Sequence, residues 1–545
     1  MAHSTQPARR HNLRAGQLFR PDSPAPARGS ELSGDTIAPM DNPRTARAKR
    51  IEAGTVLLAA VTFFTLTCAI AQTRLFWYDE IFTRQVVQLG SWKRIVAALH
   101  NGIDLQPPIF YFLTAWTRYI GGEEVGLRLP AILGFTFAGF FLYVIARRWF
   151  SPGYAAGVAV TPSILFFGQL GTEARPYGLV LGCAALALLG WTYRDRWPRA
   201  GRTGYIAGIL GAAAAHYYGF TIAVPFGAAA ACTLWRKRQW DLWTILGCVC
   251  AILPNLWNLL LIHEAIAIYK NGAWNRPNWP ALATSLYGWS LAVLAAMFLA
   301  YLLLRPVSPE ESLPDGECLA CWAGFSAVPI IAMFMAQAIS GMFVLLYFSM
   351  YSLGYGLLLA YLLAASAKGS RRVGYAAGCG ALLAFACVAG LSERRFETER
   401  DNVLLQCADF TGILDRPEYR ESHVLVGDPH LALQLSQYCD EVHNRIVFGA
   451  DPVHALLYHG NSTDNKAMLR LRESPPFTIE PLDELLGAER HELVVFDSRS
   501  SILKAYLSHE PEYASRLHLL QDGETFAILR LDPAMPSGAN GDGGK

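Results

Sequence analysis

The chain has 545 residues, of which 52% are hydrophobic and only 17% are charged, and its formal net charge is +2. Soluble domains carry about 25% charged residues, and here long uncharged stretches recur along most of the chain. These features exclude an ordinary soluble protein, and the near-neutral balance argues against a nucleic-acid partner. The sequence predicts a protein that resides in a lipid bilayer.

The first segment, residues 1–50, is rich in Pro, Ala, Arg and Ser and has no apolar periodicity. Its composition is typical of a disordered tail. The first apolar run begins only after this segment, which is too late for a cleavable signal peptide. We therefore expect a disordered, mildly basic tail on the cytoplasmic side of a membrane.

Residues 51–391 are predicted to form the membrane domain. A spanning helix needs about twenty apolar residues, and lipid forces the backbone to satisfy its own hydrogen bonds, so each span should be helical. Two of the runs are too long for one span and are expected to break near His216 and near Gly341. About eleven spans result if part of the first outer loop dips into the bilayer. The apolar runs are 53–73, 129–146, 149–172, 176–193, 203–235, 242–262, 277–304, 318–367 and 373–391.

Orientation follows from Lys and Arg, which are enriched in cytoplasmic loops. Alternate loops are basic, namely 147–148, 194–202, 236–238 and 368–372. The loop 305–317 is net acidic, but the alternation of spans still places it on the same side. The first outer loop, 78–126, and everything after Leu391 are then expected outside, as in a multi-pass protein of the cell (inner) membrane.

Residues 392–535 change character and are predicted to form a small extracytoplasmic α/β domain, followed by a disordered tail at 536–545. Strands are expected at 423–427, 492–496 and 525–530, and a helix at 431–438. Cys407 and Cys439 fall in this domain and can pair if it lies outside the cytoplasm. The expected fold class is thus an all-α polytopic membrane domain with a small C-terminal α/β domain.

Residues able to do chemistry gather on the predicted outer face. Charged groups at a membrane boundary are costly unless paired or wetted, so their co-location predicts a cavity. A carboxylate there could act as a general base, and an Arg could hold a phosphate through a bidentate fork. Two amphipathic stretches of the first loop, 92–99 and 109–120, predict interfacial helices. The candidate site residues are Asp79, Glu80, Asp104, Gln106, Glu173, Arg175, Tyr177, His216 and Tyr217.

Each candidate also has a purely structural interpretation. Asp79 and Glu80 could be a solvated helix boundary, and Pro107–Pro108 could only start a helix. Glu173 and Arg175 could be a structural ion pair. His216 and Tyr217 could satisfy the backbone where two short spans meet. The functional interpretation draws its weight from the shared face.

At these residues the chain resembles the GT-C membrane glycosyltransferases, most closely the branch with bacterial protein O-mannosyltransferase-like and aminoarabinose-transferase-like enzymes. The order and spacing of the motifs agree over about residues 50–235. The matching pieces are Trp77-Tyr78-Asp79-Glu80 and the segments 104–111, 126–131, 146–150, 173–177 and 216–219.

The resemblance implies an inverting transferase that takes a sugar from a polyprenyl-phosphate donor. Asp79 then maps to the acidic residue at the catalytic centre, with Glu80 beside it and Asp104 as the second carboxylate of the loop. The acceptor is open between a glycolipid, a polymer and a protein. A divalent metal ion is possible beside paired carboxylates, but no full ligand set is evident.

Two positions depart from the resemblance. Gln106 stands where such proteins often carry His, and Leu346 stands where many carry Arg. If that Arg normally holds the donor phosphate, then Arg175, Lys270 or Arg276 must substitute for it here.

Two other functions compete with the transferase. A transporter or flippase of lipid-linked sugars would place polar residues near the bilayer midplane, often in repeated halves. A non-catalytic assembly or sensor protein would use the soluble domain as its working part. Charges avoid the middle of the predicted spans and no two-fold repeat is visible, which disfavours a transporter. The soluble domain contains no pattern that resembles a nucleophile elbow, a phosphate loop or a metal cluster, which disfavours the third function.

Overall fold

The computed structural model describes residues 43–104, 106–269, 275–284, 314–440, 443–472, 477–488, 493–498, 503–522 and 526–532. Most of the expected N-terminal tail, most of the span 277–304 and the whole tail 536–545 lie outside these ranges. The first helix, α1 (Pro43–Thr73), begins before the expected end of the tail at Arg50. The chain divides into two compact units, Met1–Gly54 and Thr55–Lys545.

Apolar helices dominate the second unit, as the composition predicted. Within the described ranges, six helices are long and apolar enough to cross a membrane, and three shorter apolar helices accompany them. The protein is therefore a membrane protein, while the predicted number of about eleven spans stays a prediction. The helices of this part after α1 are α5 (Glu123–Ala146), α6 (Pro152–Leu170), α7 (Tyr177–Thr192), α8 (Pro198–Ala215), α9 (Ala223–Lys237), α10 (Leu242–Cys250), α11 (Leu253–Trp257), α12 (Leu259–Tyr269), α14 (Gly316–Met335), α15 (Tyr351–Ser366) and α16 (Arg371–Leu414).

Both predicted helix breaks are confirmed. Helix α8 ends before His216, whose backbone is extended, and a 3-10 helix η1 (Tyr217–Ile222) leads into α9. The second break follows a short π-helix η2 (Ala336–Ser340), where Gly341 adopts a φ of 70° that favours glycine. A 3-10 helix η3 (Leu345–Phe348) then precedes α15.

The single helix expected over 242–262 is wrong. The segment forms three short helices, α10, α11 and α12. Pro254 lies at the start of α11, where it has no N–H to continue the hydrogen-bond ladder of α10. Asn255 uses its side-chain amide to donate to the carbonyl of Tyr217 at 2.9 Å, which ties this interruption to the break after α8.

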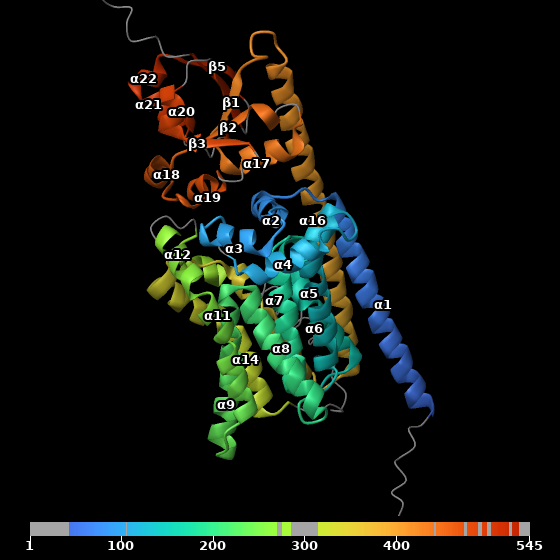
Figure 1. The fold of residues 1–545 in the computed structure, drawn as a ribbon. Coiled ribbons are helices and arrows are strands. Elements are labelled where there is room, and N and C mark those ends of the chain that lie inside the picture. Colours follow the sequence, from blue (N-terminus) through green and yellow to red (C-terminus); the bar gives the residue numbers. More distant parts are fainter. Residues whose placement is uncertain are drawn as a thin grey trace, which may run out of the picture. The chain divides into compact units, whose positions relative to one another are not determined.

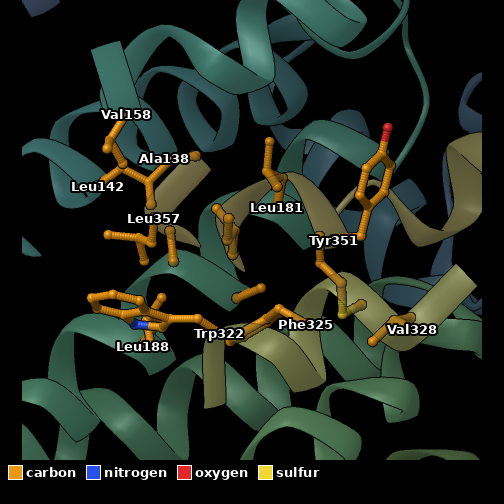
Figure 2. Close-up of a cluster of buried hydrophobic side chains, with 14 of the residues drawn as sticks. Ala138, Leu142, Val158, Leu181, Leu188, Trp322, Phe325, Val328, Tyr351 and Leu357 are labelled. Carbon is orange, nitrogen blue, oxygen red and sulfur yellow. The ribbon is translucent and has the colours of Figure 1, made fainter. Parts of the chain in front are cut away.

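A hydrophobic core holds these helices together (Figure 2). Trp322 and Phe325 of α14 are fully buried in the same cluster as Leu181 of α7 and Leu357 of α15. Glycines let some helices approach closely, as is usual in membrane bundles. A Cβ on Gly182 would lie 2.4 Å from the carbonyl oxygen of Gly134, so a larger residue would force α5 and α7 apart.

The basic loops meet at one end of this bundle, and the acidic loop joins them. Glu317 lies 2.5 Å from the Lys237 ammonium and 3.7 Å from the Arg194 guanidinium. Arg194 also contacts Asp241 at 3.5 Å. These contacts put Glu317, the last residue of the acidic segment, beside two of the basic loops, as the alternation of spans predicted.

The first outer loop carries three short helices: α2 (Tyr78–Gln88), α3 (Trp92–His100) and α4 (Pro108–Thr117). The helices expected at 92–99 and 109–120 are therefore confirmed. Pro107 caps α4 and Pro108 is its first residue, so this pair does start a helix.

The C-terminal region contains one six-stranded sheet of order β3-β2-β1-β4-β6-β5, in which β6 and β5 are antiparallel to their neighbours and the rest are parallel. The predicted α/β character and three expected strands, now β1, β4 and β6, are confirmed, whereas β2, β3 and β5 were not predicted. The strands are β1 (His423–Val426), β2 (Ile446–Ala450), β3 (Thr478–Pro481), β4 (Leu493–Ser498), β5 (Leu517–Asp522) and β6 (Phe526–Leu531). The helices are α17 (Pro429–Tyr438), α18 (Pro452–His459), α19 (Thr463–Leu471), α20 (Leu482–Ala488), α21 (Leu503–His509) and α22 (Pro511–Ala514), with a short 3-10 turn η4 (His443–Arg445).

Helix α16 passes the predicted domain boundary without a break (Figure 1). The apolar run ends at Leu391, but the helix continues to Leu414 because charged residues support helical propagation as well as apolar ones do. Cys407 of α16 and Cys439, which ends α17, form a disulfide. The pairing considered from the sequence is thus present.

Candidate active site

The segment after α1 turns sharply into α2 and places two carboxylates in its first turn. Asp79 and Glu80 are the second and third residues of α2, where the helix dipole favours negative charge. Glu80 folds back and accepts a hydrogen bond from the backbone N–H of Trp77 at 3.3 Å. This turn therefore fixes the directions of both side chains relative to the helix.

Arg175 joins two carboxylates from different parts of the first loop. Its guanidinium donates to Asp104 at 2.6 Å and lies 3.5 Å from Asp79. The phenol of Tyr111 in α4 donates to the same Asp104 oxygen at 2.5 Å. The Arg175 side chain is 5% exposed and that of Asp104 is 11% exposed, whereas that of Asp79 is 32% exposed. Two acids and one cation thus meet, and Asp79 is the acid that keeps access to solvent.

The surroundings of Asp79 raise its pKa above the ordinary value. Burial is the main cause, the Arg175 guanidinium opposes it, and the Asp104 carboxylate adds to it. A carboxylate with a raised pKa is a stronger base than an exposed one. Asp79 is therefore the more accessible of the two carboxylates and a stronger base than an exposed Asp.

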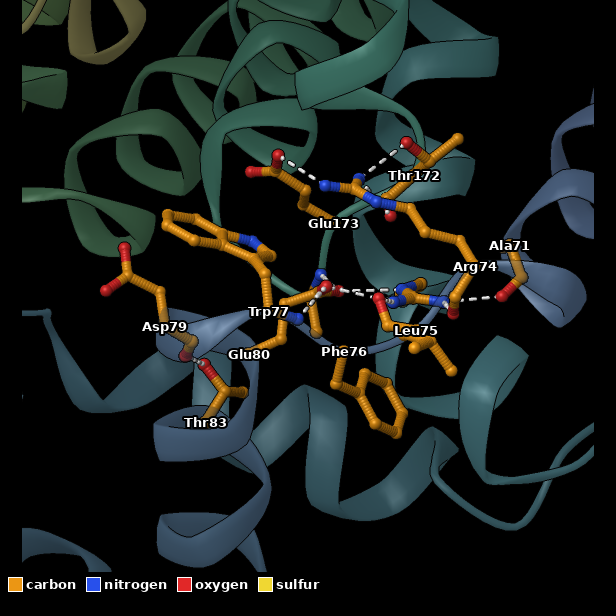
Figure 3. A network of polar contacts seen from close by, with 12 residues as sticks. Ala71, Arg74, Leu75, Phe76, Trp77, Asp79, Glu80, Thr83, Thr172 and Glu173 are labelled. Carbon is orange, nitrogen blue, oxygen red and sulfur yellow. Dashed lines mark hydrogen bonds and ion pairs between the residues drawn. The ribbon is translucent and has the colours of Figure 1, made fainter. Parts of the chain in front are cut away.

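Glu80 lies in a different environment from its neighbour. It forms an ion pair with Arg128 of α5, with Nε–Oε1 at 2.6 Å and Nη2–Oε2 at 2.9 Å, and both side chains are 0% exposed. It also accepts from the backbone N–H of Ala174 at 2.6 Å. Burial alone would raise the pKa of Glu80, but Arg128 and these hydrogen bonds outweigh burial and lower it. Figure 3 shows the Asp79 carboxylate pointing away from this network.

Glu173 pairs with Arg74 rather than with Arg175, so the structural ion pair considered from the sequence is wrong in its partner. The Glu173–Arg74 distance is 3.1 Å, and Arg74 also donates to the carbonyl of Thr172 at 2.9 Å (Figure 3). Burial, opposed by Arg74 and reinforced by Glu80, raises the pKa of Glu173 to about 7. Arg175 is thereby left for Asp79 and Asp104.

Aromatic rings form one wall beside Arg175. The ring of Tyr347 in η3 lies 5.4 Å from that of Tyr177 and 4.8 Å from that of His216. His216 accepts from the backbone N–H of Tyr218 through Nδ1 at 3.1 Å, and the half-buried Tyr217 is fixed through its carbonyl by Asn255. Tyr177 at the start of α7 and Tyr347 of η3 thus meet His216 and Tyr217, which lie at the break after α8.

The site contains residues beyond the predicted set. Tyr111 lies inside the matching segment 104–111, and Tyr347 directly follows Leu346. The sequence therefore pointed to both segments but not to these two tyrosines. Of the three cations considered in place of Leu346, Arg175 contacts the carboxylates, Arg276 is exposed, and Lys270 lies outside the described residues.

Several buried polar atoms around the site have no hydrogen-bond partner among the described residues. Such atoms are rare in folded proteins because each costs about 1–3 kcal/mol, and their concentration here suits a polar ligand. Gln106 and His216 are the most buried of the predicted residues that carry such an atom, each at 2% exposed. The atoms are Trp77 Nε1, Gln106 Oε1, Glu173 Oε2, Arg175 Nε and His216 Nε2.

No group of three or more His, Cys, Asp or Glu side chains that could hold a metal ion occurs in the described part of the chain. The paired carboxylates at the site are Asp79 and Asp104, and the single positive charge of Arg175 lies against both of them.

No protein-family model and no curated protein matches the sequence. Solved structures with this fold include two of one protein. ArnT from Cupriavidus metallidurans bound to undecaprenyl phosphate has a TM-score of 0.54 and 14% identity, and the match covers 88% of this chain and 98% of ArnT. The same protein in its apo state has a TM-score of 0.55 and 13% identity over the same shares. The chain thus has the fold of ArnT, and the resemblance to GT-C glycosyltransferases is confirmed at the level of the fold, over far more than residues 50–235.

Proposed function

We propose that this protein is an integral-membrane glycosyltransferase that moves a sugar from a polyprenyl-phosphate donor to an acceptor hydroxyl. The observation that carries the proposal is the Asp79–Arg175–Asp104 cluster, set in a fold shared with a protein that binds undecaprenyl phosphate. A lipid phosphate needs a cation, and the acceptor hydroxyl needs a base. The cluster provides both, because Arg175 and Asp79 lie 3.5 Å apart.

The reaction proceeds as a single displacement. Asp79 takes the proton of the acceptor hydroxyl, whose oxygen attacks the anomeric carbon of the sugar. The bond from that carbon to the phosphate oxygen breaks, and its electron pair leaves with polyprenyl phosphate. The configuration at the anomeric carbon is inverted because attack and departure occur on opposite faces. Arg175 stabilises the charge that develops on the leaving phosphate.

The other site residues divide into two groups. Asp104 and Tyr111 hold the Arg175 guanidinium in place. Glu80, which the resemblance placed beside the catalytic residue, anchors the start of α2 to Arg128 and positions Asp79. Gln106, Glu173, Tyr177, His216 and Tyr217 line the place where sugar and phosphate would bind, through the unpartnered buried atoms and the aromatic wall.

We propose that the site faces the outer side of the cell membrane. Disulfides persist in oxidising compartments, and the Cys407–Cys439 disulfide lies in the C-terminal domain. The basic loops share the opposite end of the bundle with Glu317, in agreement with a cytoplasmic location.

The test uses membranes that contain the full chain, supplied with an extract of labelled polyprenyl-phosphate sugars. We expect Asp79→Asn to reduce label transfer by about 10²–10⁴-fold at an unchanged membrane level. Asp195→Asn is the matched control, because Asp195 is exposed on a loop at the other end of the bundle. Parent-level transfer by Asp79→Asn would refute Asp79 as the base, and a failure of the parent itself to transfer the label would favour a transporter.

A further inference from the structure

The C-terminal domain and the first outer loop share one hydrophobic core. Tyr78 and Phe82 of α2 belong to the same buried cluster as Leu431 and Leu435 of α17, and the cluster continues into the sheet through Phe448. Burial of this kind stabilises an interface because it removes apolar surface from water. The domain is therefore docked on the loop that carries Asp79.

Side chains of α17 form hydrogen bonds with this loop on both sides of Asp79. The phenol of Tyr438 accepts from the backbone N–H of Phe76 at 2.5 Å. The side-chain oxygen of Gln437 accepts from Arg84 at 2.9 Å. Asp79 lies between these two anchor points, so its position depends on a domain that begins more than three hundred residues later in the chain.

His430, near the start of α17, reaches the residue directly before Asp79. Its ring stacks on that of Tyr78, with centroids 4.1 Å apart and an interplanar angle of 23°. Its Nε2 lies 3.8 Å from the carboxylate of Asp464 in α19. Tyr78 is buried, whereas the His430 side chain is 50% exposed, so the imidazole covers the ring from the solvent side.

The charged groups with the largest effect on His430 are acidic. Burial lowers its pKa, but Asp464, Asp428 and Asp79 outweigh burial and raise the pKa above 6.5. In return, the positive charge of His430 lowers the pKa of Asp79, whereas Asp464 raises it. His430 and Asp79 therefore influence one another electrostatically although they come from different domains.

We propose that the C-terminal domain is part of the reaction centre, in which His430, held by Asp464 and stacked on Tyr78, is a positioning residue that orients the Tyr78–Asp79 segment and stabilises the Asp79 carboxylate. This role rests on the proposed function of Asp79 as the base. It gives the domain a task in the transferase reaction, because undocking of α17 removes a positive charge from the base.

The first experiment measures the coupling from the side of His430 and needs no substrate. Histidines of the full chain are labelled for NMR in lipid nanodiscs, and His430→Gln assigns the signal. We expect Asp79→Asn to lower the His430 titration midpoint by roughly half a unit to one unit. His518 is the internal control, since it has a similar exposure of 48% and its own partner, Asp532, at 3.0 Å. An unchanged His430 midpoint in Asp79→Asn overturns the proposal.

The second experiment measures the same coupling from the side of Asp79. Dicyclohexylcarbodiimide modifies protonated carboxyl groups, so the pH dependence of Asp79 labelling, read by mass spectrometry, follows its protonation. His430→Gln removes a cation and should shift the labelling midpoint to higher pH, by a similar roughly half a unit to one unit. His518→Gln should leave it unchanged. Equal midpoints in His430→Gln and the parent overturn the proposal.

These outcomes separate the inference from the proposed function. If the two titrations are coupled but Asp79→Asn still transfers sugar, the proposed function fails and the domain contact stands. If Asp79→Asn abolishes transfer but the titrations are independent, the transferase stands and the role of His430 fails. In the case where both hold, His430→Gln should also shift the acidic limb of the transfer rate to higher pH.

Discussion

Asp79 and Glu80 are adjacent in the sequence, yet their carboxylates lie in opposite environments. Successive residues of a helix point about 100° apart, and Figure 3 shows the two side chains pointing apart. The partly exposed Asp79 reaches Arg175, while Glu80 forms a fully buried pair with Arg128. Because the two environments differ, substitution of Glu80 should affect stability, whereas substitution of Asp79 should affect activity.

Glu80 should matter for stability. Removing one partner of a buried ion pair costs about 3–5 kcal/mol, because the other charge is left buried and uncompensated. We therefore expect Glu80→Ala to lower the thermal unfolding temperature in detergent markedly, whereas Asp79→Asn leaves it near the parent value. If Glu80→Ala unfolds at the parent temperature, the Arg128 pair does not anchor α2.

Arg175 should determine the affinity for a lipid phosphate. A hydrogen bond to a charged group contributes about 1.5–3 kcal/mol, so Arg175→Ala should weaken undecaprenyl phosphate binding by roughly ten- to a hundredfold, as measured by native mass spectrometry. Arg175→Lys keeps the charge but loses the planar guanidinium. Its affinity for undecaprenyl phosphate should therefore lie between those of the parent and Arg175→Ala. Arg395→Ala, at an exposed pair with Glu399, is the control and should bind like the parent. Equal affinities in Arg175→Ala and the control contradict this role.

Glu173 should make the protein less stable as the pH rises. Its pKa in the folded state is raised from 4.5 to about 7, so the folded state binds the proton more tightly than the unfolded chain does. The stability contributed by this proton is full below pH 4.5 and is lost as the pH rises to about 7. The loss amounts to at most roughly 3 kcal/mol.

Glu173→Gln tests this directly, because it is isosteric and cannot ionise. Unfolding temperatures measured between pH 4.5 and 7.5 should fall less steeply for this variant than for the parent. The slope difference should be absent in Glu393→Gln, since Glu393 is exposed on α16. Parallel curves for Glu173→Gln and the parent would show that the carboxyl titrates normally.

The Cys407–Cys439 disulfide should stabilise the docked C-terminal domain. It closes a separation of 32 residues, and the chain-entropy model assigns such a loop roughly 3–4 kcal/mol. We expect Cys407→Ser/Cys439→Ser to increase amide hydrogen exchange in α17 and at Phe76, where Tyr438 binds. Cys379→Ser/Cys387→Ser replaces two exposed free cysteines and should exchange like the parent. No change in the first variant means that α17 holds its place without the disulfide.

The helical architecture was largely predictable. Apolar runs of spanning length have one solution in lipid, and breaks at His216 and Gly341 followed from runs too long for one helix. The predicted helix boundaries were wrong where the residues that set them stand out little from their neighbours in the sequence. The interruption at Pro254 lies in a run that is apolar throughout, and α16 outlasts its apolar stretch because charged residues extend a helix equally well.

The sequence predicted which residues gather at the candidate site, but not which of them form ion pairs with one another. Loop alternation placed Asp79, Asp104 and Arg175 on one face, and the structure brings them into contact. Glu173 was paired with the wrong arginine, because Arg74 lies at the end of α1, and sequence distance carries no information about which of two cations is nearer.

The sequence by itself determined that this is a membrane protein, because apolar runs of spanning length are a local property of the chain. It also determined at which end of the bundle the charges gather and which segments carry the site. Only the tertiary structure decided that Glu80 is buried against Arg128 while Asp79 is not, and that α17 grips the first loop. Those outcomes depend on contacts between distant segments, in which burial and pairing set the charge of each group.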